Sequence, residues 1–124
     1  MFSRWVFWIA GIYGLLVMLP QYFLEERIGR DAPPPITHLE YFYGFVGVVV
    51  AWQVVFLIIG CDPQRYRLLM LPSILEKLSF GVAVMVLWSQ GKVVLPVPIF
   101  ASIDLVLGVL FAAAFWTTGG KRKP

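Results

Sequence analysis

Four long runs of apolar residues alternate along this chain with short stretches that hold most of its charged side chains. A helix that crosses a membrane needs roughly 20 apolar residues. The runs therefore predict four membrane helices, over about residues 4–24, 41–60, 73–91 and 98–118. We expect an all-α integral membrane protein of a single domain, built as a bundle of four transmembrane helices.

The polar stretch between the second and third runs carries two helix-start signals. Asp62 and Pro63 suit the N-cap and the first residue of a helix. We therefore expect a short helix over residues 63–71 that lies in the membrane interface. Ser73 and Glu76 then have the spacing of a capping box, which would open the third membrane helix.

Basic side chains near this stretch are candidates for contact with lipid headgroups. Arg65 and Arg67 lie within the expected interfacial helix, and Lys77 follows soon after it. Long basic side chains keep their charge in water or at phosphates while their stems lie against apolar surface. We therefore expect all three to reach the headgroups, with Pro72 ending or kinking the short helix.

Two other polar segments complete the layout. Residues 25–39 contain the triple proline Pro33–Pro35, which favours an extended polyproline form and predicts a water-exposed connection. Residues 119–124 form a short basic tail.

The amino-acid composition supports a membrane protein and limits the metal and cofactor chemistry that the chain could support. The chain has 124 residues, of which 60% are hydrophobic and 14% charged, whereas soluble domains are near 45–50% and 25%. The net charge of +3 does not indicate a nucleic-acid partner, because the basic residues sit at the ends of apolar runs. With one cysteine, Cys61, and one histidine, His38, we expect no disulfide, no metal site and no cofactor.

Small residues recur four positions apart in each of the four runs. Such pairs let helix backbones approach closely in lipid. They predict the packing faces of a compact bundle, through Ala10 and Gly14, Gly47 and Ala51, Ser79 and Ala83, and Gly108 and Ala112.

Polar side chains inside apolar runs are costly in lipid and are therefore candidates for function. Glu76 has two interpretations: a buried carboxylate for proton handling or for a cationic ligand, or the capping residue of its helix. Gln53 lies at a similar depth, so a hydrogen bond between Gln53 and Glu76 would satisfy both. Lys77 is not expected to neutralise Glu76, because neighbours on a helix point about 100° apart.

Asp104 is the second acidic candidate, about six residues inside the last helix. It is either buried in a functional or bundle-locking role, or solvated at the interface. Gly108 and Ala112 follow it on one face, so we expect Asp104 to face the bundle interior. The hydroxyl of Tyr43 is a candidate partner, and Tyr13 lies at a matching depth on the first helix.

The segments DPQRYRLLMLPSILEKLSFG (62–81) and IDLVLGVLF (103–111) resemble small bacterial four-helix membrane proteins, similar in size and layout to the DoxX-like group. That group has been linked to thiosulfate or quinone-coupled oxidation and to accessory roles beside redox enzymes. The resemblance implies the architecture. It does not imply the activity, because no residue set here would carry redox or hydrolytic catalysis.

Two functions remain for a chain of this kind. The first is a membrane component without its own catalytic site, an accessory or structural subunit that packs against a larger complex or binds lipid. Its partners would be membrane lipids together with other subunits or a second copy. The second is a small transporter or a bundle that binds a hydrophobic ligand through Glu76 or Asp104. A pigment or quinone among the aromatic side chains stays open.

Basic residues predict the topology, because cytoplasmic loops carry an excess of lysine and arginine. Seven basic residues fall on the side of the membrane that holds the two termini and the connection between the second and third helices: Arg4, Arg65, Arg67, Lys77, Lys121, Arg122 and Lys123. Three fall on the opposite side: Arg27, Arg30 and Lys92. We therefore expect a multi-pass protein of the bacterial inner membrane with both termini in the cytoplasm.

A fluorescent reporter that works only in the cytoplasm should be active when fused after Pro124, and a phosphatase that works only in the periplasm should be inactive there. A fusion after Arg30 should give the opposite pair, and the reverse result at both sites would contradict the topology.

Overall fold

The computed structural model describes residues 2–31 and 35–119, and within these ranges the chain is helical with no strand. Its long helices are α1 (Phe2–Met18), α3 (Leu39–Cys61), α4 (Met70–Ser89) and α5 (Val97–Gly119). Shorter elements are the 3-10 turn η1 (Leu19–Phe23), the helix α2 (Glu25–Asp31) and the 3-10 turn η2 (Arg67–Leu69).

Four helical segments of the described chain are long and apolar enough to cross a membrane. They are Phe2–Phe23 with 22 residues, and Leu39–Cys61, Arg67–Ser89 and Val97–Gly119 with 23 residues each. The expected all-α chain with four helices of membrane-crossing length is therefore confirmed.

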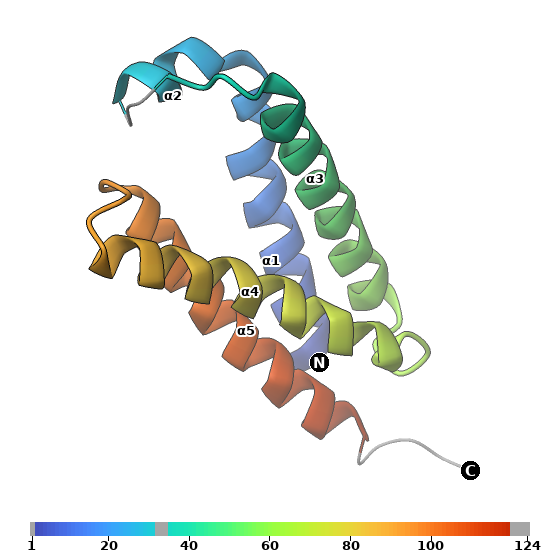
Figure 1. Ribbon diagram of the computed structural model, residues 1–124. Helices are drawn as coiled ribbons and strands as arrows, with labels where there is room; N and C mark the ends of the chain where they lie inside the picture. The colour runs from blue at the N-terminus through green and yellow to red at the C-terminus, as the bar shows by residue number, and fades with distance from the viewer. Residues whose placement is uncertain (1, 32–34, 120–124) are drawn as a thin grey trace.

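The long helices are arranged as two hairpins (Figure 1). In the N-terminal hairpin α1 packs along α3, and in the C-terminal hairpin α4 packs along α5. The hairpins meet through α1 and α5, near the start of α1. From there the hairpins diverge, the N-terminal one toward α2 and the C-terminal one toward the α4–α5 connection, so that α3 and α4 contact each other only slightly.

Three phenylalanine rings form the junction between the hairpins. Phe7 of α1 stacks on Phe111 of α5 with ring centroids 4.2 Å apart, and Phe56 of α3 meets Phe111 edge-on at 4.9 Å. All three side chains are fully buried. Buried aromatic pairs stabilise by about 0.5–1.5 kcal/mol beyond their area burial. We call Phe7, Phe56 and Phe111 the phenylalanine junction.

Polar contacts reinforce the same end of the molecule. The Ser3 and Thr118 hydroxyls lie 2.6 Å apart and tie α1 to α5. Arg67 donates from Nε to the Phe115 carbonyl oxygen at 3.0 Å, and its guanidinium lies 3.7 Å from the centre of the Phe115 ring. The connection before α4 is thereby attached to α5.

Close helix approach depends on glycines that have no small residue four positions away. A Cβ on Gly11 would come within 2.9 Å of the Gln53 carbonyl oxygen, and one on Gly81 within 2.6 Å of the Leu105 side chain. Gly60 lies under the Trp8 ring. These three glycines lie at helix contacts within the two hairpins. The pattern of small residues four positions apart did not predict them.

The connection between α3 and α4 differs from the expected interfacial helix over residues 63–71. Residues 63–66 form a turn, η2 follows, and α4 already begins at Met70. Pro72 does not end a helix, because it is the third residue of α4, where the N–H groups have no intrahelical partner. The expected capping box is also wrong, since the Ser73 hydroxyl donates to the Leu69 carbonyl oxygen at 2.7 Å inside the helix.

The expected connection over residues 25–39 contains the short helix α2 in its first half. Pro33 and Pro34 lie outside the described residues, as does the basic tail after Gly119.

Replacement of Gly11 by leucine should destabilise the N-terminal hairpin, because the new side chain would meet backbone of α3. We expect a loss of about 1–3 kcal/mol in the free energy of unfolding, measured by circular dichroism in mixed micelles. Gly44→Leu on α3 is the matched control, since a Cβ there meets nothing within 4 Å. Equal stability of the two variants would contradict this packing.

Candidate functional site

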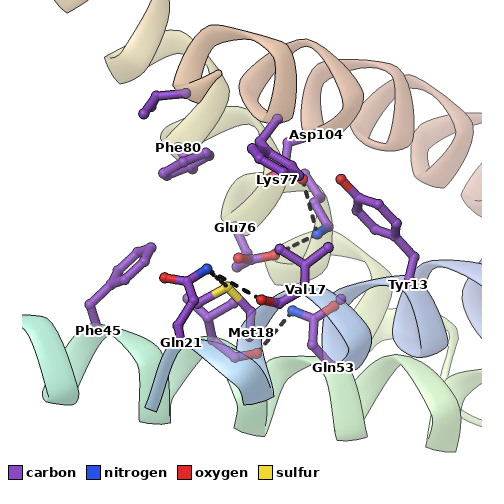
Figure 2. Close-up of a pocket in the computed structure, with 14 residues that line it drawn as sticks. Tyr13, Val17, Met18, Gln21, Phe45, Gln53, Glu76, Lys77, Phe80 and Asp104 are labelled. Atoms are coloured by element: carbon purple, nitrogen blue, oxygen red, sulfur yellow. Dashed lines mark hydrogen bonds and ion pairs between the residues drawn. The ribbon is translucent and has the colours of Figure 1, made fainter. Parts of the chain in front are cut away.

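A cavity of about 260 Å³ lies where the two hairpins diverge, and all four long helices line it. Figure 2 shows its side chains pointing inward from both hairpins. Its polar lining consists of Tyr13, Gln21, Gln53, Glu76, Lys77 and Asp104. The rest of the wall is apolar and includes Val17, Met18, Phe45, Val49, Phe80 and Phe100.

Lys77 is the centre of the charged part of this cavity. Its side chain is 4% exposed, and Nζ lies 3.4 Å from Asp104 Oδ1 and 3.8 Å from Glu76 Oε1. The two carboxylate side chains are 15% and 16% exposed. One lysine therefore lies between two largely buried acids, one from its own helix and one from α5 (Figure 2).

The expected position of Lys77 at the headgroups is wrong. Its stem packs near Gly108, whose missing side chain lets α5 approach the Lys77 Cβ, and its ammonium lies 5.2 Å from the centre of the Phe56 ring. A flexible four-carbon stem lets Nζ approach both Asp104 and the neighbouring Glu76, although the two Cβ directions on α4 differ.

Gln53 is fully buried on the α3 wall of the cavity, beside Gly14 of α1. Its Nε2 donates to the Val49 carbonyl oxygen at 2.9 Å. Among the residues that the structure describes, Gln53 Oε1 has no hydrogen-bond partner, and neither has Glu76 Oε1. A Cβ on Gly14 would overlap the Gln53 side chain, so a larger residue there would displace this amide.

Two expected hydrogen bonds are not formed. Gln53 and Glu76 line the same cavity, but Gln53 Nε2 donates to the Val49 carbonyl oxygen, and Gln53 Oε1 and Glu76 Oε1 are both acceptors. The Tyr43 hydroxyl donates to Glu25 Oε1 at 2.9 Å and is not the partner of Asp104. Glu25 belongs to α2, an element that the sequence did not predict.

The small residues proposed for packing lie in different environments. Ala10, Gly14 and Gly108 are buried, and Gly47 and Ala112 are half-buried. Ala51, Ser79 and Ala83 are exposed on the outer faces of α3 and α4. Gly108 contacts Leu78 and Lys77, so the face that begins at Asp104 is where α4 docks on α5.

The other candidate residues lie away from the cavity. Arg65 is exposed, whereas Arg67 is half-buried against α5. His38 and Glu40 form an exposed ion pair at 3.8 Å, and Cys61 is an exposed thiol. Over the described residues, no group of three histidine, cysteine or acidic side chains is placed to hold a metal ion.

Comparisons with protein-family models, with curated proteins and with solved structures found no match to this chain. The resemblance to the DoxX-like group therefore stays a prediction from the sequence.

Replacement of Lys77 by methionine should leave two buried carboxylates without a counter-charge. Removal of one partner of a buried ion pair typically costs about 3–5 kcal/mol, so we expect a loss of that size in the free energy of unfolding. Addition of Asp104→Asn should restore part of it, because a neutral amide needs no counter-charge.

Lys92→Met is the control for this prediction, since Lys92 is exposed in the α4–α5 connection. Surface substitutions usually change stability by less than about 0.5 kcal/mol. If Lys77→Met were as stable as Lys92→Met in mixed-micelle unfolding, the interaction with the two acids would contribute nothing to the fold.

Proposed function

We propose that this protein is a multi-pass protein of the bacterial inner membrane, with cytoplasmic termini, that binds a hydrophobic molecule between its hairpins and has no catalytic site of its own. The cavity is the observation that carries this proposal. Ligand sites are concave, mostly apolar and lined by a few convergent polar groups, and this cavity has all three properties.

The size of the cavity limits what it takes. Sites for drug-sized ligands enclose about 300–1,000 Å³, and the volume here is about 260 Å³. A small amphiphile, or the head and first part of a lipid, therefore fits better than a large pigment. Phe45, Phe80 and Phe100, from three different helices, supply an apolar wall for such a molecule.

The outer surface supports the membrane setting. Large apolar side chains are exposed along the helices, among them Ile12 and Leu16 on α1, Leu75 on α4 and Val109 and Trp116 on α5. Soluble monomers rarely expose contiguous apolar patches beyond a few hundred Å². Such an apolar surface is stable when lipid or another membrane protein covers it.

A second candidate is the accessory subunit that the sequence favoured. The slight contact between α3 and α4 is the observation in its favour, because no helix of the described chain packs between the diverging ends of the two hairpins. A helix from a larger complex, or from a second copy of this chain, would cover that opening. The two candidates differ in what is purified with the protein, a small molecule or a polypeptide.

The test is to purify the chain in mild detergent and identify bound molecules by native mass spectrometry. Val49→Phe should fill part of the cavity and lower ligand occupancy roughly tenfold or more, because Val49 lines it. Val48→Phe is the matched control on the same helix, where the side chain is 60% exposed.

A small molecule retained by wild type and Val48→Phe but lost from Val49→Phe supports ligand binding. A stoichiometric protein partner that is retained by all three proteins, with no bound small molecule, supports the accessory role instead.

A further inference from the structure

We propose that the molecule bound in the cavity carries a protonated primary or secondary amine on an apolar body. This inference rests on the proposed function, since it names the chemical class of the ligand for that same site. Four features of the cavity support it: its net charge, its unpartnered acceptors, the orientation of Gln53 and its aromatic wall.

The charges in the cavity do not cancel. Glu76 and Asp104 contribute two carboxylates, and Lys77 contributes one ammonium, which leaves one negative charge when all three are ionised. A second cation would complete the set, whereas an anionic headgroup would add to the excess. Uncompensated charge is costly in surroundings of low polarity.

Two buried oxygens of residues that line the cavity have no hydrogen bond within the described residues, and a ligand would reach them by a rotation of either side chain. They are Gln53 Oε1 on α3 and Glu76 Oε1 on α4, and the second lies 3.8 Å from Lys77 Nζ, beyond hydrogen-bond distance. A buried acceptor that stays unpaired destabilises the protein, because it has lost its hydrogen bonds to water. A ligand that stabilises both must bring N–H or O–H groups, and an ammonium brings these together with the missing positive charge.

The Val49 carbonyl sets the orientation of the Gln53 amide. Nε2 donates to that oxygen at 2.9 Å, and a flipped amide would place two acceptors against each other. The free acceptor of Gln53 is therefore its amide oxygen, which lies beside Gly14 on the α1 side of the cavity lining.

Aromatic rings on the wall suit the rest of such a ligand. Phe45 and Phe80 stack with centroids 6.0 Å apart and bridge α3 and α4 along the cavity. Ring faces attract cations, and the ring bodies bury apolar surface. Lys77 already uses the Phe56 ring in this way, at 5.2 Å.

The test uses four probes with the same eight-carbon chain: octylammonium, octyltrimethylammonium, octanol and octanoate. The full chain is reconstituted in nanodiscs of neutral lipid, and binding is measured by calorimetry against empty nanodiscs. We expect octylammonium to bind roughly tenfold to a hundredfold more tightly than octanol, as charged hydrogen bonds would give. Octyltrimethylammonium should bind more weakly than octylammonium, because it has the charge but no N–H donor.

Two variants test the named acceptors. Gln53→Leu removes the free oxygen with little change in volume, and Glu76→Gln removes the charge with the same shape. Each should reduce the preference for octylammonium over octanol roughly tenfold. Gln64→Leu and Glu40→Gln are the matched controls, since both residues are exposed and outside this cavity, and the preference should be unchanged.

The outcomes separate the two claims. If octanol or octanoate binds wild type as tightly as octylammonium, the inference about the amine is overturned while the hydrophobic site stands. An unchanged preference in folded Glu76→Gln also overturns the inference, even if Gln53→Leu does not fold. If none of the four probes binds wild type, the proposed function fails as well.

Discussion

The fold depends on the phenylalanine junction, because it is the place where three of the four long helices meet. Phe7, Phe56 and Phe111 are fully buried near the start of α1, where Phe7 stacks on Phe111 and Phe56 meets both rings edge-on. Helices joined tightly at one end need not be parallel, and here the hairpins diverge beyond the junction (Figure 1). The cavity lies in that divergence, so the packing of the junction also creates the site.

Hydropathy alone predicted the four long helices, since each apolar run is long enough to cross a membrane. The ends of the helices were harder to predict. Pro72 indicated a break, but a proline in the first turn of α4 removes no intrahelical hydrogen bond. The sequence predicted Gly14 but missed Gly11, Gly60 and Gly81, because the search required two small residues on one face, whereas one is enough where a large side chain packs over it.

The candidate polar residues were found from the sequence because a polar side chain stands out in an apolar run. Gln53, Glu76 and Asp104 all line one cavity. Their partners were not found, because partnership depends on how α4 and α5 are rotated about their axes, which hydropathy does not record. Lys77 was assigned to the headgroups for this reason, although the close approach of α5 at Gly108 buries it.

The pairing of Lys77 with Asp104 has a consequence for biosynthesis. The two residues are 27 positions apart, on successive helices. During translation α4 therefore leaves the ribosome with Glu76 and Lys77 before Asp104 of α5 exists. In a chain that enters the membrane, α4 alone would lack the carboxylate that lies closest to Lys77, Asp104 at 3.4 Å, and the helix face of α5 that covers the lysine stem. In a membrane the C-terminal hairpin would therefore be favoured as one unit of insertion, and a chain truncated between α4 and α5 would be a substrate for membrane quality control.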